Sequence, residues 1–269
     1  MIIPAPSSVA FSVFNFPIYW YGIILASAIF VAIIIGNKFF NVINVKMRKD
    51  VIISCAPLII ISGIIGARLY FCLLNPSYYF AHPIEIFDIR QGGLSIHGAI
   101  ILGVPALMIS ALKNKVPVMN VLDSMSCATI LGQAIGRWGN YFNSEAYGFP
   151  VNGQTWGVFI PESKRVVEYM NYSLFHPTFL YESILDLFGF GILTFILFKF
   201  GKKYSGVSFF AYLTVYSVIR FFVERIRIDS ALDIGSLHVA EIMSVILFVI
   251  GIAGMIFCFC RGRQSPNNI

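Results

Sequence analysis

The segment GRWGNYFNSE, residues 136–145, places an arginine, two asparagines and a glutamate directly after a run of uncharged, mostly apolar residues. In a second segment four polar side chains are spaced by four, four and three residues, which places them on one face of a helix. They are Tyr216, Arg220, Glu224 and Arg227. Guanidinium groups hold a phosphate by parallel hydrogen bonds, and a low dielectric strengthens these bonds. The two segments therefore predict a site for an anion such as a phospholipid headgroup.

Other ionisable residues lie within or beside apolar runs, where each charge costs about 3 kcal/mol on insertion scales and indicates function until a structural partner is found. They are Arg68, His97, Asp123, Glu182 and Asp186. For Asp123 and Asp186 we expect hydrogen bonds between helices. If the helix continues through the first segment, one of its faces carries Arg137, Asn140, Tyr141 and Ser144.

Structural interpretations of these residues stay open beside the functional ones. Arg220 and Glu224 could form an internal ion pair that only stabilises the helices. His97 could bond a neighbouring backbone carbonyl without taking part in chemistry. Arg225 and Arg227 are expected to extend toward the membrane interface.

The composition requires a membrane for the elements that position these residues. The 269 residues are 58% hydrophobic and 12% charged, with a mean hydropathy of +0.80, outside the usual range of soluble proteins. Seven apolar runs approach or exceed the roughly 20 residues that a spanning helix needs. They cover residues 18–36, 51–74, 95–112, 117–136, 178–198, 206–223 and 238–260. The sequence predicts an all-α polytopic membrane protein with about seven transmembrane helices, forming a single integral membrane domain over residues 1–269.

The net charge of +6 follows membrane topology, and the basic residues form no nucleic-acid patch, so we expect no nucleic-acid partner. Basic residues mark alternate connections between the runs. They are Lys38, Lys46, Arg48 and Lys49, then Lys113 and Lys115, then Lys199, Lys202 and Lys203, and finally Arg261 and Arg263. The positive-inside rule assigns these connections to the cytoplasm. The amino terminus is then outside and the carboxyl terminus cytoplasmic.

The connection 137–177 lies on the predicted outer side, between the fourth and fifth helices. Its length and its repeated glycines and prolines predict a small extracytoplasmic cap, inserted into the membrane domain. The five cysteines and four histidines lack the spacing of a metal or redox motif. We expect neither a metal nor another cofactor.

Three stretches together resemble one family. They are GGLSIHGA (92–99), GQAIGRWGNYFNSEAYG (132–148) and HPTFLYE (176–182). The second contains the pattern G-R-x-G-N-x-x-N-x-E-x-x-G, matched by Gly136, Arg137, Gly139, Asn140, Asn143, Glu145 and Gly148. YWYG (19–22) and YSVIRFFVE (216–224) are also similar to segments of this family, the prolipoprotein diacylglyceryl transferases. The likeness covers essentially the whole chain, although Phe179 stands where some members have Gln.

The resemblance implies a transferase of the bacterial cytoplasmic (plasma) membrane. Such enzymes move the diacylglyceryl group of phosphatidylglycerol to the lipobox cysteine thiol in the signal peptide of a preprolipoprotein, the first step of lipoprotein maturation. A thioether forms and glycerol phosphate leaves. The implied partners are phosphatidylglycerol, that signal peptide and the lipid bilayer. A secondary transporter or channel is the alternative, but the polar residues cluster toward one side instead of the midplane.

The family's important positions fall on eight residues of this chain. As catalytic residues we predict His97, Arg137 and Arg220, and as substrate-binding residues Arg137, Asn140, Glu145, Gly148, Tyr21 and Glu224. His97 would take the thiol proton, and the two arginines would bind the phosphate. The two glutamates would hold the arginines, and Gly148 would permit a close backbone turn.

Overall fold

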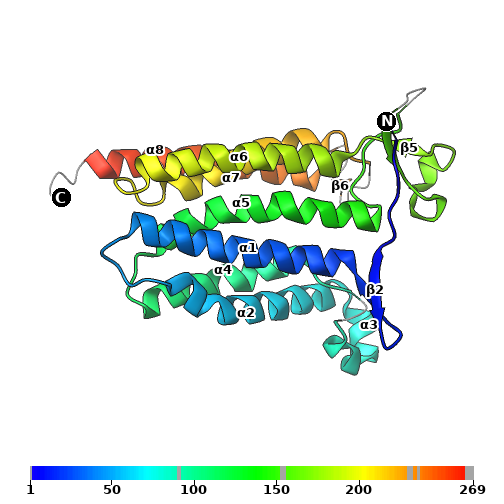
Figure 1. Cartoon of the computed structure of the whole chain (residues 1–269), viewed down its shortest axis with the longest axis horizontal. Helices are drawn as coiled ribbons and strands as arrows, with labels where there is room; N and C mark the ends of the chain where they lie inside the picture. The colour runs from blue at the N-terminus through cyan, green and yellow to red at the C-terminus, as the bar shows by residue number, and fades with distance from the viewer. Residues whose placement is uncertain (1, 90–91, 152–155, 229–232, 235–236, 264–269) are drawn as a thin grey trace. The chain divides into compact units, whose positions relative to one another are not determined.

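Seven long apolar helices dominate the computed structural model, which describes residues 2–89, 92–151, 156–228, 233–234 and 237–263 (Figure 1). They are α1 (Trp20–Ile43), α2 (Val51–Leu74), α4 (Ile96–Lys113), α5 (Val118–Asn143), α6 (Thr178–Phe200), α7 (Val207–Glu224) and α8 (Val239–Arg263). The predicted all-α polytopic architecture is confirmed. The chain forms two compact units, a larger one of Met1–Gly36 with Leu122–Ile269 and a smaller one of Asn37–Val121.

In the smaller unit, helices α2 and α4 pack against each other. They approach so closely that a Cβ built on Gly66 would lie 2.3 Å from the carbonyl oxygen of Gly98. Small residues permit such an approach between membrane helices and favour their van der Waals packing. The chain between α2 and α4 forms the short helix α3 (Pro76–Ala81) and the 3-10 helix η1 (Pro83–Phe87). The glycine crossing therefore lies beside the first turn of α4, which carries His97.

Asp50, directly before α2, joins the end of α1 to the start of α2. Its Oδ1 accepts hydrogen bonds from Nδ2 of Asn37 at 2.8 Å and of Asn41 at 2.9 Å. The two donors lower the pKa of the Asp50 carboxyl below its ordinary value. A carboxyl group with a lowered pKa stabilises the folded state at pH values above the ordinary aspartate pKa. This contribution to stability is lost as the pH falls through the pKa of the folded state.

In the larger unit, α7 packs against both α6 and α8. Asp123 of α5 accepts hydrogen bonds from the backbone N–H groups of Gly206 at 2.6 Å and Phe209 at 2.8 Å. These bonds satisfy donors that the start of α7 would otherwise leave unpaired. The prediction that Asp123 is hydrogen-bonded to another helix is confirmed.

Short strands accompany the helices of the larger unit. Strands β1 (Ile2–Ile3), β4 (Gly157–Phe159) and β5 (Leu174–Phe175) form one sheet in the order β1-β4-β5, with β1 parallel to β4 and β5 antiparallel to it. Strands β2 (Val9–Val13) and β3 (Phe16–Tyr19) form a hairpin, and β6 (Asp233–Ile234) pairs with β7 (Leu237–His238). Strands this short have too few residues for an alternating pattern, so the sequence did not predict them.

The segment between α5 and α6 packs around an apolar core that it shares with the first turn of α6. The core residues are Tyr147, Val158, Ile160, Phe175 and Phe179, and Ile3 of β1 packs against them. Between β4 and β5 lie two 3-10 helices, η2 (Glu162–Lys164) and η3 (Val167–Tyr169). The hydroxyl of Tyr147 donates to the carbonyl oxygen of Lys164 at 2.7 Å and so fastens this segment to its core.

Helix α5 continues beyond the predicted end of the fourth span at residue 136. It runs through Gly139 to Asn143, and Ser144 then takes a left-handed φ of 53°. Arg137 and Asn140 thus stand on the last turns of the helix. Ser144 lies beyond the helix end, so the expectation that it shares their face is wrong.

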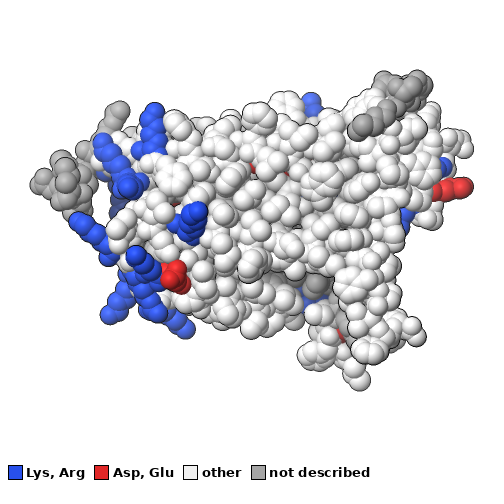
Figure 2. Space-filling model, viewed as in Figure 1, with Lys and Arg blue, Asp and Glu red and all other residues white. Residues whose placement is uncertain are grey.

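At the other ends of α6 and α7, the connection between them meets α8. The rings of Tyr204 and Phe259 contact each other with their centroids 4.8 Å apart. Lys202 and Lys203 belong to this connection, and basic side chains gather over this end of α8 (Figure 2). In the larger unit, basic residues thus mark the helix ends opposite to those that carry Arg137 and Arg220.

Candidate active site

A chain of ion pairs joins three helices of the larger unit. Arg137 of α5 pairs with Glu182 of α6 through Nη2 and Oε1. The other carboxylate oxygen of Glu182 lies 3.8 Å from Nη1 of Arg220 on α7. Arg220 also pairs with Glu224, one turn later on α7, at 2.5 Å between Nη2 and Oε2. We call Arg137, Glu182, Arg220 and Glu224 the ion-pair chain.

The acids of the ion-pair chain are more deeply buried than its bases. The side chains of Glu182 and Glu224 are 1% and 3% exposed, whereas those of Arg137 and Arg220 are each 18% exposed. Burying an ion is costly unless partners compensate it, and each glutamate has a guanidinium partner. The guanidinium groups therefore keep some surface for a further anion. The arrangement is both a stabilising network and a candidate site.

Asn140 and Glu145 form a second polar group near the end of α5. Nδ2 of Asn140 donates to Oε1 of Glu145 at 2.9 Å, and Nδ2 of Asn143 reaches the same oxygen at 3.4 Å. The backbone N–H of Glu145 also donates to the carbonyl oxygen of Asn140 at 3.0 Å. Glu145 therefore orients two side-chain amides. We predicted that it holds an arginine, but Arg137 pairs with Glu182 instead.

Tyr21, in the first turn of α1, lies against α5. A Cβ built on Gly139 would be only 2.9 Å from Cδ2 of the Tyr21 ring, so the ring occupies space that any larger residue at 139 would need. Tyr21 also interacts electrostatically with Glu145 and with Arg137. The structure thus brings together six of the predicted site residues, namely Tyr21, Arg137, Asn140, Glu145, Arg220 and Glu224.

Gly148 is in contact with the segments that precede α6 and follow α7. Its N–H donates to the carbonyl oxygen of His176 at 2.9 Å, and it forms an antiparallel bridge with Arg227. A Cβ at this position would lie 2.8 Å from the carbonyl oxygen of Ile226 and 3.0 Å from Cβ of His176. The position requires glycine because other backbone and side-chain atoms approach it closely.

We expect Gly148→Ala to destabilise the protein, because overpacking costs about 1–3 kcal/mol when neighbours cannot move. The thermal unfolding midpoint in detergent should fall, and activity should fall with it. Gly191→Ala is the matched control, since a Cβ on Gly191 of α6 meets nothing within 4 Å. Equal midpoints for the two variants would contradict the close packing inferred at Gly148.

Asp186 lies one helical turn beyond Glu182 on α6 and is fully buried. Neither of its carboxylate oxygens has a hydrogen-bond partner within the residues that the structure describes. Our expectation of a hydrogen bond between helices is therefore wrong for this residue. The two guanidinium groups nearby, those of Arg137 and Arg220, form their ion pairs with Glu182 and Glu224 instead. Tyr216 of α7 interacts electrostatically with Arg137 in the same region.

His97 belongs to the smaller unit, in the first turn of α4. It is exposed, and its ring lies 5.9 Å from that of Tyr70 between centroids. The contact orients the imidazole against α2. That His97 reaches the ion-pair chain stays a prediction.

Glu182 is the residue that our site prediction omitted. Its sequence signal was present, because it is a carboxylate inside an apolar run and ends the stretch HPTFLYE. Arg225, which we expected to extend toward the interface, pairs with Glu241 of α8 at 3.1 Å. It also lies over the ring of Phe221 at 4.6 Å.

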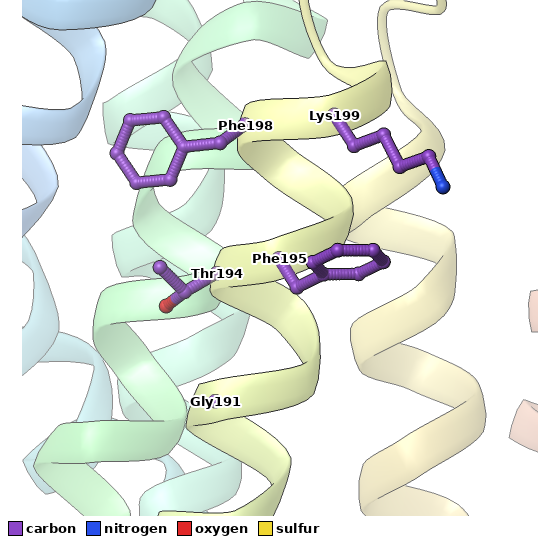
Figure 3. A pocket seen from close by; sticks show the side chains of 5 residues that line it. All are labelled: Gly191, Thr194, Phe195, Phe198 and Lys199. Carbon is purple, nitrogen blue, oxygen red and sulfur yellow. The ribbon is translucent and has the colours of Figure 1, made fainter.

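An open groove of about 630 Å³ lies along the second half of α6, away from the ion-pair chain. Gly191, Thr194, Phe195, Phe198 and Lys199 line it (Figure 3). Nζ of Lys199 lies 5.1 Å from the centre of the Phe195 ring. The other four lining residues provide apolar surface and one hydroxyl, so the groove lacks the acid–base groups that the ion-pair chain has.

Fold and site together define a polytopic membrane protein with a charged site between three of its helices. A family model described as prolipoprotein diacylglyceryl transferase matches residues 8–257. The phosphatidylglycerol–prolipoprotein diacylglyceryl transferase of Acaryochloris marina is 38% identical to this chain, over 99% of the chain and 96% of the relative. The enzyme of the same name from Nostoc is 37% identical, over 98% of the chain and 93% of the relative. An enzyme of this name from Clostridium perfringens is 39% identical, covering 97% of this chain and 98% of the relative.

The chain belongs to the prolipoprotein diacylglyceryl transferase family. It is therefore a membrane transferase, and the transporter alternative is not supported.

Proposed function

We propose that this protein transfers the diacylglyceryl group of phosphatidylglycerol to the lipobox cysteine of a preprolipoprotein signal peptide. One observation carries the assignment of the site. Two guanidinium groups from separate helices, Arg137 and Arg220, share the carboxylate of Glu182 and remain partly exposed. Such a pair suits a phosphodiester, which can accept hydrogen bonds from both groups.

The reaction is a displacement at a glyceryl carbon. A carbon–sulfur bond forms, the carbon–oxygen bond to the phosphate breaks, and the bonding electrons move to the phosphate oxygen. The thiol proton must leave, because an ordinary thiol with a pKa of about 8.5 is mostly protonated at neutral pH. The site therefore needs a proton acceptor for the sulfur and cationic donors for the leaving oxygen.

The cationic donors are Arg137 and Arg220, which stabilise the charge gathering on the phosphate. Glu182 and Glu224 hold these two groups in place. Asn140, itself oriented by Glu145, hydrogen-bonds the headgroup.

His97 takes the thiol proton, directly or through water. Tyr21 donates to the lipid or shapes its entrance, and Gly148 keeps the segment after α5 close to the ends of α6 and α7.

We place the site at the outer face of the bacterial cytoplasmic membrane. The amino terminus and the segment 137–177 are then outside, the latter as a cap, and the carboxyl terminus is cytoplasmic. The support is the separation of charges in the larger unit, where the basic α6–α7 connection and the ion-pair chain occupy opposite ends of the same helices.

The direct test mixes purified protein in detergent with phosphatidylglycerol and a lipobox peptide and measures the peptide mass. We expect a gain of one diacylglyceryl group, absent with a Cys→Ser peptide. An unmodified wild-type peptide would overturn the proposed function. Unchanged turnover after alkylation of the native cysteines is also expected, because the nucleophile belongs to the substrate.

His97→Gln should lower turnover by about 100-fold and change its pH dependence, since glutamine keeps hydrogen bonding without comparable basicity. His82→Gln is the control, because His82 stands after α3 and has no proposed role. Initial rates over a range of pH measure both effects. A His97→Gln variant with the wild-type rate and pH profile would remove His97 as the base.

A further inference from the structure

Arg68 of α2 is a buried cation, and within the described residues its hydrogen-bonding partners are backbone carbonyl groups. It is 7% exposed. Its Nε donates to the carbonyl oxygen of Ile86 at 2.9 Å, and its Nη2 to that of Glu85 at 2.5 Å. Its Nη1 donates to the carbonyl oxygens of two consecutive glycines, Gly92 at 3.1 Å and Gly93 at 3.0 Å. One side chain thus joins η1 to Gly92 and Gly93, which lie shortly before α4.

No carboxylate pairs with Arg68 within the part of the chain that the structure describes. The carboxylate of Glu85 instead accepts the hydroxyl of Tyr78 at 2.6 Å. The guanidinium lies 5.2 Å from the centre of the Tyr79 ring, where the face of the ring attracts it. Burying an arginine without a carboxylate partner costs free energy of folding. This cost indicates that the protein needs the hydrogen bonds of this guanidinium for another purpose than stability.

The two glycines that Arg68 holds have backbone conformations that other residues rarely adopt. Gly92 and Gly93 have φ values of 90° and 70°. A Cβ on Gly93 would lie 2.4 Å from Nη1 of Arg68, so the glycine is also needed for the guanidinium to reach the carbonyl groups. Two residues later, the N–H of Ser95 donates to the carbonyl oxygen of Ala67 at 3.0 Å. The chain is thus bound to α2 until α4 begins at Ile96.

His97 follows directly and is fixed from the same helix. Its ring contacts that of Tyr70, two residues after Arg68 on α2. The next residue, Gly98, crosses Gly66 so closely that its Cβ would lie 2.1 Å from the Gly66 carbonyl oxygen. Within the described residues, the ring contact of His97 and the close crossing at Gly98 both involve residues 66–70 of α2.

We propose that Arg68 is a positioning residue for His97, acting through the turn at Gly92 and Gly93. This inference rests on the proposed function, in which His97 takes the thiol proton. Arg68 itself touches neither the thiol nor the lipid. Its guanidinium fixes the path of the backbone into α4 and thereby aims the imidazole, and an error of about 1 Å at a catalytic group costs about 100-fold in rate.

The test uses Arg68→Lys in the full chain, because one ammonium group cannot replace a fork that donates to four carbonyl groups. We expect kcat to fall about 10- to 100-fold and KM for phosphatidylglycerol to change less than about threefold. The pH profile should resemble that of His97→Gln. In a His97→Gln background, Arg68→Lys should have little further effect, because the two residues act as a unit.

Gly93→Ala provides a second route to the same result, since it displaces the guanidinium without removing its charge. Arg165→Lys is the matched control. Arg165 also donates to two carbonyl oxygens, those of Ile160 and Met170, but lies between α5 and α6 in the larger unit. It should keep kcat and the pH profile of the wild type.

Amide hydrogen exchange of residues 92–99 tests the positioning independently of activity. Arg68→Lys should speed exchange there about tenfold or more, and Arg165→Lys should not. Wild-type exchange in Arg68→Lys, or rate losses that multiply with those of His97→Gln, would overturn the inference. If wild-type protein makes no thioether product, the proposed function fails, while the exchange measurement still decides whether Arg68 holds the turn.

Discussion

Glu182→Gln should lower the rate of diacylglyceryl transfer about 100-fold or more, because one carboxylate holds two guanidinium groups from different helices. Removing one partner of a buried ion pair costs about 3–5 kcal/mol, and each 1.4 kcal/mol of lost transition-state stabilisation is about tenfold in rate. The amide keeps the size of the side chain but not its charge. Initial rates with phosphatidylglycerol and a lipobox peptide measure the effect.

The control for Glu182→Gln lies one turn further along α6. Asp186→Asn also replaces a fully buried acid by its amide, but neither side-chain oxygen of Asp186 has a hydrogen-bond partner within the described residues. We expect its rate to stay within about threefold of wild type. If Glu182→Gln keeps or exceeds the wild-type rate, the carboxylate only competes with the headgroup for the guanidinium groups. Its role in positioning Arg137 and Arg220 is then refuted.

Arg137→Lys should lose most of the activity, about 100-fold, although the charge is kept. A lysine ammonium cannot donate two parallel hydrogen bonds to a phosphate while it also pairs with Glu182. Both kcat and KM for phosphatidylglycerol should worsen, because the guanidinium binds the headgroup and stabilises the leaving oxygen.

Arg48→Lys is the matched control, since Arg48 is exposed and donates to Asn114 of the smaller unit at 2.7 Å. It should retain wild-type kinetics. Near-normal turnover of Arg137→Lys would exclude bidentate recognition of the phosphate and would show that the position needs only a positive charge.

The sequence predicted the spans well because each needs only an uninterrupted apolar run of about 20 residues. It placed Arg220 and Glu224 on one helix face, since their spacing of four residues is local. It could not show that Glu182 bridges Arg137 and Arg220, because that contact depends on how three helices pack. The predicted end of the fourth span was early, because Arg137 interrupts the apolar run without ending the helix.

The role expected for Glu145 failed for a related reason. We expected Glu145 to hold an arginine, but the turn after Asn143 brings its carboxylate to the side-chain amides of Asn140 and Asn143. Arg68 shows the same limit. Its four acceptors are backbone carbonyl groups, which every residue has, so no pattern of side chains could identify them.

The ion-pair chain has as many acids as bases, so with all four groups ionised it is electrically neutral. A lipid headgroup is then held by the alignment of donors at short range, not by an excess of positive charge that draws anions from a distance. Dissolved salt screens distant charges strongly but close, partly buried contacts much less. Raising the ionic strength should therefore leave the rate of transfer nearly constant. No net positive charge of the ion-pair chain retains the departing glycerol phosphate.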